Sequence, residues 1–309
     1  MNILVTGGAG FIGSNFVHYL VGLRLKNLKI FVLDSLTYAS SLANLEGIDN
    51  EIVEIIIGDI CDKELVEKVL AKVNYVIHFA AESHVDNSIK SPSKFVSTNV
   101  LGTQVLLDAV RKNSIEKFLF VSTDEIYGSI KSGSFVESDN YNPSSPYSAS
   151  KAAGEMLVLS YGTTYGIKYN ISRCSNNYGP RQHHEKLIPH FIELLKKSNP
   201  VTLYGDGLNI RDWIYVEDHC VALFKILLTG TAGAVYNVSS SEEFSNLEIT
   251  KHLLSLMGLS ESLINFVEDR PGHDFRYSIS AEKIKIDLGF TPKTHFNVGI
   301  KKTVDWFMK

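Results

Sequence analysis

The amino-acid sequence predicts an α/β protein with a doubly wound parallel sheet and a smaller C-terminal α/β lobe. In the first 150 residues, short apolar runs alternate with segments of helical periodicity. Short buried strands that alternate with helices predict a parallel sheet covered on both faces, because parallel strands are joined through crossover helices. A glycine-rich turn at 6–13 joins the first apolar run to the first helical segment, at the strand end where such sheets bind ligands.

The predicted strands follow from the short apolar runs, and the predicted helices follow from the segments of helical periodicity. Strands are predicted at Asn2–Thr6, Lys29–Leu33, Ile52–Ile57, Tyr75–Phe79, Phe118–Ser122 and Lys168–Ser172. Helices are predicted at Ile12–Leu23, Lys63–Lys72 and Ser93–Lys112, and around 147–162.

The character of the chain changes after about residue 174. Pro180, Pro189 and Pro200 indicate breaks between its elements. Short helices are predicted at Asn246–Met257 and Ala281–Leu288. We therefore divide the chain into residues 1–174, which carry the dinucleotide turn and the catalytic candidates, and residues 175–309, a lobe whose segments are expected to interleave with the first part.

Composition excludes several classes of protein. The 309 residues are 44% hydrophobic and 21% charged, with a net charge of −4, so no basic field attracts nucleic acid. No apolar stretch reaches the roughly 20 residues of a membrane span, and the first residues enter a strand rather than a signal peptide. Cys61, Cys174 and Cys220 are few and widely spaced, as expected for reduced thiols in the cytoplasm.

The glycine-rich turn reads Thr-Gly-Gly-Ala-Gly-Phe-Ile-Gly over residues 6–13, with glycines spaced as GxxGxxG. Such glycines permit a tight turn and a close approach of the backbone to a pyrophosphate at the helix N-terminus. Asp34 ends the next strand, where a carboxylate accepts hydrogen bonds from a ribose and repels a 2′-phosphate. We therefore predict NAD rather than NADP as the cofactor. Asp59 and Ile60 would flank its adenine, although Asp59 could instead be a helix N-cap.

The catalytic candidates follow the fifth strand and open a later helix. Tyr147 and Lys151 share one helical face, and a lysine ammonium beside a tyrosine is expected to lower the phenol pKa and make it a general base. Thr123 can bind the same substrate hydroxyl. Simple hydride transfer needs nothing more, so the adjacent Asp124 and Glu125 indicate a second proton transfer, unless they only start a helix.

With these residues, the chain resembles the extended short-chain dehydrogenase/reductase superfamily and, within it, the nucleoside-diphosphate-sugar 4,6-dehydratases that act on dTDP-glucose. The resemblance runs nearly end to end. It rests on TGGAGFIG (6–13), LDSLTYASSL (33–42), HFAAESHVDNSI (78–89), STDEIYG (122–128), SPYSASKA (145–152), CSNNYGP (174–180), EKLIP (185–189), RDWIYVEDHC (211–220) and DRPGHDFRY (269–277). It implies a Rossmann-type domain with a smaller nucleotide-sugar lobe, bound NAD and a homodimer that pairs helices around 93–112 and 147–162.

The resemblance also implies roles for individual residues. In the family mechanism, Tyr147 takes the C4 hydroxyl proton, Glu125 removes the C5 proton and Asp124 protonates the departing C6 hydroxyl. The implied cofactor site comprises Gly7, Gly10, Phe11, Ile12, Gly13, Asp34, Ser35, Leu36, Thr37, Asp59, Ile60, Ala80, Ala81, Ser83, Thr98, Tyr147, Lys151 and Asn177. The implied substrate site comprises Ser83, Thr123, Asn176, Lys186, Leu187, Thr202, Tyr204, Arg211, Asn246, Asp269, Arg270 and His273, the arginines suiting a diphosphate.

Three segments depart from the dTDP-glucose pattern: residues 178–186, which contain Arg181, His183 and His184; the serines and acids of 236–243; and Thr202, where proline is common. They leave the nucleotide base and the hexose open, with UDP-N-acetylglucosamine and UDP-glucose as alternative substrates. A nucleotide-sugar 4-epimerase would not need Asp124 or Glu125, and an inactive NAD-binding regulator would be expected to lack Tyr147 or Lys151. No metal-ligand spacing is present, and His78 is predicted to be a core histidine.

Overall fold

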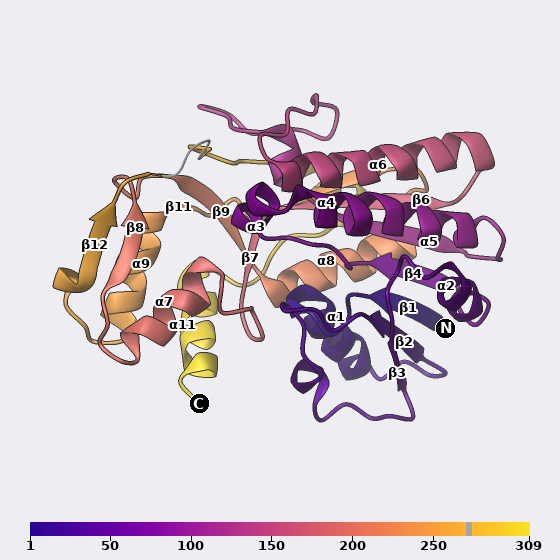
Figure 1. Ribbon diagram of the computed structural model, residues 1–309, viewed down its shortest axis with the longest axis horizontal. Helices are drawn as coiled ribbons and strands as arrows, with labels where there is room; N and C mark the ends of the chain where they lie inside the picture. The colour runs from indigo at the N-terminus through magenta and orange to yellow at the C-terminus, as the bar shows by residue number, and fades with distance from the viewer. Residues whose placement is uncertain (270–273) are drawn as a thin grey trace.

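A seven-stranded parallel sheet forms the centre of the computed structural model, which describes residues 1–269 and 274–309 (Figure 1). Its order is β10-β6-β5-β4-β1-β2-β3, and every neighbouring pair is parallel. The predicted doubly wound sheet is therefore confirmed, and the ends of the six predicted strands differ from the observed ones by two residues at most. The strands are β1 (Asn2–Thr6), β2 (Lys29–Asp34), β3 (Val53–Ile57), β4 (Tyr75–His78), β5 (Lys117–Thr123), β6 (Tyr169–Cys174) and β10 (Val235–Val238).

Helices cover both faces of this sheet because the strands are apolar on both sides. One face packs against α1 (Phe11–Gly22), η1 (Leu42–Leu45), α8 (Val216–Thr229) and α10 (Glu282–Leu288). The other packs against α2 (Lys63–Leu70), α5 (Thr103–Val110) and α6 (Pro146–Tyr165). Helix α6 starts with a Ser145–Ser148 capping box and ends at Gly166, which takes a left-handed conformation.

The helix predicted at Ser93–Lys112 is not regular. It runs from α4 (Pro92–Phe95) through a π-helical segment, η2 (Val96–Gly102), into α5, and the short α3 (Val85–Lys90) precedes it. The buried Asn99 lies in this wide turn, and its side chain bonds both main-chain groups of Glu82. Helical periodicity alone does not reveal such a bulge, which is often found beside functional sites.

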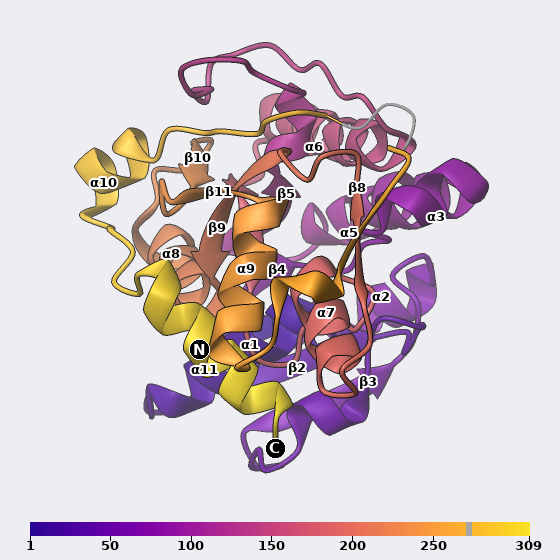
Figure 2. The ribbon, with the colours of Figure 1, turned by 90° about the vertical axis from the view of Figure 1, so that its left-hand side faces the viewer.

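The C-terminal lobe has its own core, built from small sheets and three helices (Figure 2). The order β11-β9-β7 forms one sheet and the pair β12-β8 forms another. The elements are β7 (Asn176–Tyr178), α7 (Leu187–Leu195), β8 (Val201–Tyr204), β9 (Ile210–Tyr215), β11 (Glu243–Ser245), α9 (Asn246–Leu256), η4 (Glu261–Leu263), β12 (Ile264–Val267) and α11 (Phe296–Phe307). Helices α7 and α11 were not predicted; Pro189 lies in the first turn of α7, where proline is tolerated.

Residues after 174 contribute to both parts of the molecule. Helix α8 packs on the main sheet, and β10 extends that sheet beyond β6 before the chain returns to the lobe at β11. The lobe lies beside the carboxyl ends of the parallel strands, so the main hollow forms between them (Figure 1). In the part of the chain that the structure describes, no helix is long and apolar enough to cross a membrane.

Candidate active site

A cavity of about 650 Å³ lies at the carboxyl ends of β1, β2, β4, β5 and β6. The turns after parallel strands meet at one edge of a sheet, which brings sequence-distant motifs together. Most of the predicted site residues line this cavity: Gly7, Gly10, Phe11, Ile12, Gly13, Asp34, Ser35, Thr37, Asp59, Ile60, Ala80, Ala81, Ser83, Thr98, Thr123, Asp124, Glu125, Tyr147, Lys151, Asn176, Asn177, Lys186 and Leu187.

The glycine turn lies at the N-terminus of α1 and depends on its missing side chains. Gly7 has φ +68, and a Cβ there would lie 2.7 Å from the Ala80 nitrogen. A Cβ on Gly13 would lie 2.2 Å from the Gly7 oxygen. The first turn of a helix has N–H groups without helical partners, and residues 10–13 of this turn line the cavity. The turn is therefore a cradle that fits the pyrophosphate of a dinucleotide.

Asp34 is buried beside this cradle and holds the turn in place. Its Oδ2 accepts a 2.9 Å hydrogen bond from the Ala9 nitrogen, and its Oδ1 accepts from the Leu36 nitrogen and from Ser40 Oγ. The Leu36 side chain packs against the core and does not line the cavity. Asp59 is not the N-cap of α2, because Asp62 caps that helix and Asp59 faces the cavity.

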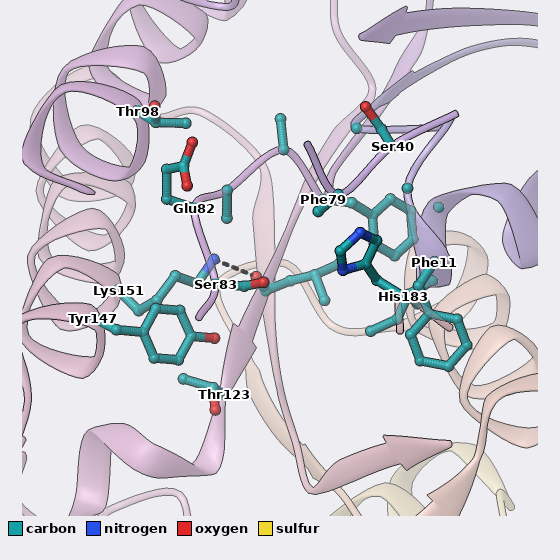
Figure 3. Close-up of a pocket in the computed structure, with 18 of the residues that line it drawn as sticks. Phe11, Ser40, Phe79, Glu82, Ser83, Thr98, Thr123, Tyr147, Lys151 and His183 are labelled. Carbon is teal, nitrogen blue, oxygen red and sulfur yellow. Dashed lines mark hydrogen bonds between the residues drawn. The ribbon is translucent and has the colours of Figure 1, made fainter. Parts of the chain in front are cut away.

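Tyr147 and Lys151 project from the first turns of α6 toward the end of β5. In Figure 3, the Tyr147 hydroxyl points toward Thr123, while the Lys151 amine donates a 2.7 Å hydrogen bond to the Val121 main-chain oxygen. Tyr147 and Lys151 are both buried. Phe11, Phe79 and His183 lie across the cavity from them (Figure 3).

The expected lowering of the phenol pKa is not found in this structure. Burial, and then the negative charge of Glu125, raise the pKa of Tyr147 well above its ordinary value, although a hydrogen bond with Thr123 opposes the shift. Burial lowers the pKa of Lys151 to about 8. A buried, uncompensated phenolate is costly, so Lys151 alone does not make Tyr147 a base at neutral pH.

Asp124 and Glu125 begin a short 3-10 helix, η3 (Asp124–Tyr127), whose N-cap is Thr123. They therefore start a helix and also line the cavity. Asp124 is buried and accepts a hydrogen bond from Thr123 Oγ1 at 3.3 Å, and among the residues that the structure describes its Oδ2 has no hydrogen-bond partner. Burial, with the nearby charges of Glu125 and Asp212, raises the pKa of Asp124 well above its ordinary value. A raised pKa favours the protonated carboxyl, which is the form that can act as a general acid.

Asn99 and several cavity residues are not among the predicted site residues. Asn99 follows the cavity residue Thr98 but does not itself line the cavity. Asn99 donates to Ser150 Oγ at 2.8 Å, and Ser150 donates to the Tyr147 main-chain oxygen at 2.7 Å, so Asn99 joins the 80–83 loop to α6. Further lining residues that were not in the predicted site include Ser40, Glu82, Lys94, Cys174, Ser175, Gln182, His183, Glu185 and Trp213.

Five predicted substrate residues lie in the lobe and do not line this cavity: Thr202, Tyr204, Arg211, Asn246 and Asp269. Arg211 is buried on β9, with its guanidinium 4.2 Å from the centre of the Tyr277 ring. It donates to the main-chain oxygens of Asp274 and Phe275, and it is close enough to Asp124 to lower that carboxyl pKa. Arg270 and His273 fall outside the described residues.

The segment 178–186 divides its unusual residues between two places. His183 lines the cavity and meets the Tyr38 ring edge-on at 5.7 Å between centres. Arg181 does not line the cavity; its guanidinium stacks on Trp306 and donates to Asn15 Oδ1. His78 is a buried core histidine, as predicted, hydrogen-bonded to Thr6 and Thr103. Among residues 1–269 and 274–309, no cluster of three metal-ligating side chains occurs.

Comparison with known proteins gives matches over the whole chain. A family model described as GDP-mannose 4,6 dehydratase matches residues 4–303. The chain is 50% identical to the low-salt glycan biosynthesis protein Agl12 of Haloferax volcanii, over 100% of this chain and 99% of that one. It is 47% identical to a dTDP-glucose 4,6-dehydratase of Streptomyces antibioticus, over 99% and 92%.

Solved structures agree with these matches. A dTDP-glucose 4,6-dehydratase from Streptomyces venezuelae, crystallised with NAD, superposes with a TM-score of 0.97 at 45% identity and covers 100% of this chain and 97% of that one. A UDP-glucose 4-epimerase from Thermotoga maritima superposes with a TM-score of 0.93 at 31% identity, covering 100% and 99%. The resemblance inferred from the motifs is confirmed: this chain belongs to the GDP-mannose 4,6 dehydratase family, within the extended short-chain dehydrogenase/reductase fold.

Proposed function

We propose that this protein is an NAD-dependent nucleoside-diphosphate-sugar 4,6-dehydratase that converts dTDP-glucose to dTDP-4-keto-6-deoxyglucose and water. The observation that carries the proposal is the position of Asp124 and Glu125, which line the same cavity as Tyr147 and Lys151. Oxidation at C4 needs only the last two residues with Thr123. The two carboxyl groups supply the acid and the base that elimination of water requires.

The reaction begins with removal of the C4 hydroxyl proton by Tyr147, while Thr123 orients that hydroxyl. Bound NAD would supply the acceptor for the C4 hydride and its donor to C6, and its oxidised ring would add a positive charge to the cavity. This charge would oppose the burial that raises the Tyr147 pKa. The residues that would hold NAD are the glycine turn, Asp34 and the loop at 80–83, all of which line the cavity.

Elimination of water then uses the two carboxyl groups. The 4-keto group acidifies the C5 proton, which Glu125 removes. Asp124, held protonated by burial, gives its proton to the departing C6 hydroxyl, so water leaves and a 4-keto-5,6-ene remains. After the hydride reaches C6, Glu125 returns a proton to C5. The product is a 4-keto-6-deoxy sugar.

The lobe is the proposed nucleotide site. Arg211 would face the diphosphate, and Thr202 and Tyr204 are exposed on β8 where a base can lie against them. Purified protein should be incubated with dTDP-glucose, UDP-glucose and UDP-N-acetylglucosamine, and its products identified by mass. The proposal is supported if dTDP-glucose loses water with the highest kcat/KM of the three sugars. If a UDP sugar has the highest kcat/KM, the proposed substrate is wrong but the proposed dehydratase reaction holds.

The 4-epimerases are the second candidate function, because they share this fold. An epimerase also uses Tyr, Lys and NAD, but it returns the hydride to C4 and releases no water. The acid–base pair at 124–125 favours the dehydratase. A keto product that absorbs in alkali distinguishes the two, and an epimerised sugar of unchanged mass would exclude the dehydratase.

We also propose a homodimer that functions in the cytoplasm. The helical run 92–110 and α6 lie side by side on one face of the sheet and expose Val96, Leu101 and Met156 (Figure 1). Pairing this surface with that of a second copy would bury these side chains. Free thiols at Cys61, Cys174 and Cys220 agree with a reducing compartment. A mass equal to that of a single chain, measured by analytical ultracentrifugation, would contradict the dimer.

A further inference from the structure

A buried ion pair lies directly behind the catalytic residues. Arg173 on β6 and Glu155 on α6 are 2% and 0% exposed, and Arg173 Nη2 lies 2.8 Å from Glu155 Oε2. Neither residue lines the cavity. Glu155 follows Tyr147 and Lys151 at spacings of four residues, so the three side chains share one face of α6.

All of the donor groups of this arginine are engaged. Nε and Nη2 donate to Glu155, Nη2 also donates to Tyr141 Oη at 2.6 Å, and Nη1 donates to Tyr127 Oη and to the Glu137 main-chain oxygen. Tyr127 in turn donates to Asn237 Oδ1 on β10 at 2.9 Å. The arginine fork therefore joins α6 to the end of η3.

The two segments joined in this way carry the two halves of the chemistry. Helix α6 carries Tyr147 and Lys151, which serve C4 oxidation, and η3 carries Asp124 and Glu125, which serve elimination. Tyr127 is the last residue of η3, two positions after Glu125. Ile126 and Tyr127 of η3 also pack directly against Ala152 of α6, and Arg173 adds a hydrogen-bonded connection between the two segments.

Stability alone does not account for this pair. Removing two charges from water costs several kcal/mol per ion, and apolar residues of similar volume often replace such a pair without loss of stability. A fully bonded pair instead fixes geometry. We propose that Arg173 and Glu155 are positioning residues that set the placement of Asp124 and Glu125 relative to Tyr147 and Lys151. The inference rests on the proposed dehydratase function.

Glu155 has a second effect, on the charge of Lys151. Lys151 is faced by Tyr147 and Glu155 from α6, by Cys174 from β6 and by His78 from β4, and it donates to the Val121 oxygen on β5. Of these, the negative charge of Glu155 is the main influence that raises the Lys151 pKa against burial. Glu155 therefore helps to keep Lys151 an ammonium group.

The test separates the two half-reactions in the full-length protein with bound NAD. Tyr127→Phe removes only the hydroxyl that joins η3 to Arg173, and Tyr75→Phe is the matched control, because the Tyr75 hydroxyl bonds Glu116 far from the cavity. A single turnover of dTDP-glucose gives the rate of dinucleotide reduction and the rate of water loss. A displacement of about 1 Å can cost about a hundredfold in rate.

We expect Tyr127→Phe to reduce NAD at close to the parental rate and to lose water about tenfold or more slowly, so reduced dinucleotide accumulates. Arg173→Lys, which keeps a positive charge but loses the fork, should behave in the same way. Glu155→Gln should shift the alkaline limit of the oxidation step to lower pH. Tyr75→Phe should match the parent.

Two results separate failure of the inference from failure of the function. If the parent releases 6-deoxy product while Tyr127→Phe and Arg173→Lys both match it in the two steps, the positioning role is overturned and the dehydratase stands. If the parent itself loses no water from any nucleotide sugar, the proposed function falls. Should Arg173→Lys fail to fold, Tyr127→Phe still decides the question, since it deletes one hydroxyl.

Discussion

Lys151 donates its hydrogen bond to the main-chain oxygen of Val121, two residues before Thr123 on β5. The bond anchors the amine beside the cavity and ties α6 to the strand that ends in the catalytic turn. Burial holds the pKa of Lys151 near 8, so the protein keeps a costly ammonium group where the chemistry needs one.

Lys151→Met should therefore lower the catalytic rate and raise the stability of the folded protein. We expect the rate of dinucleotide reduction to fall by at least about a hundredfold, because Tyr147 loses its cationic neighbour. The pKa of Lys151 is about 8 in the folded protein and 10.5 ordinarily, so the unfolded chain binds this proton more tightly. The stability of the parent therefore rises as pH increases from about 8 to 10.5. The variant should be more stable than the parent at pH 7, and the difference should shrink toward pH 10. Urea unfolding at several pH values measures it.

Asp124→Asn should stop water loss and leave C4 oxidation largely intact. The folded pKa of Asp124 is raised, so ionisation costs stability as pH rises above the ordinary carboxyl value of 3.8. An amide never ionises, so the variant should gain stability over the parent from about pH 4 toward neutral pH. A variant that still releases 6-deoxy product at the parental rate would remove Asp124 from the acid role.

Glu125→Gln should also keep dinucleotide reduction but block removal of the C5 proton. We expect reduced dinucleotide to persist with the sugar bound, and product formation to fall by at least about a hundredfold. Exchange of C5 hydrogen with deuterated water reports this step directly. Glu193→Gln, on the exposed side of α7, is the control. Parental exchange in Glu125→Gln would contradict the base role.

Asp34→Asn should weaken the selection of NAD over NADP. The Asp34 carboxylate fixes the glycine turn through Ala9 and faces the cavity, where its charge would repel a 2′-phosphate. Removing the charge should reduce the ratio of NADP Kd to NAD Kd by about tenfold or more. Calorimetry on protein stripped of dinucleotide measures both constants. If the ratio of the two Kd values does not change in Asp34→Asn, other residues select NAD over NADP.

The sequence was sufficient for the sheet and for most of the cavity, because both depend on local patterns. Apolar runs locate the strands, and strand ends converge on one edge, so the pattern predicts that Gly7, Asp34 and Thr123 lie together, while Asn176 follows from the family resemblance. The sequence does not predict α7, because Pro189 is typical of a break, nor the π-helical turn, because helical periodicity does not reveal it.

Electrostatics and long-range pairing could not be predicted in the same way. The raised pKa of Tyr147 depends on its burial and on the nearby negative charge of Glu125, and the spacing of Tyr147 and Lys151 reveals neither. Arg173 lies 18 residues from Glu155 and 46 from Tyr127, so only folding reveals that one arginine joins them. The roles of individual residues therefore remain predictions that the variants above test.

Transfer of one hydrogen within the sugar tests the central claim most directly. dTDP-glucose carrying deuterium at C4 should be turned over by the parental protein, and the position of the label in the product determined by mass spectrometry and NMR. The mechanism predicts that the deuterium appears in the new C6 methyl group. Product that forms with no deuterium in that methyl group would contradict the account.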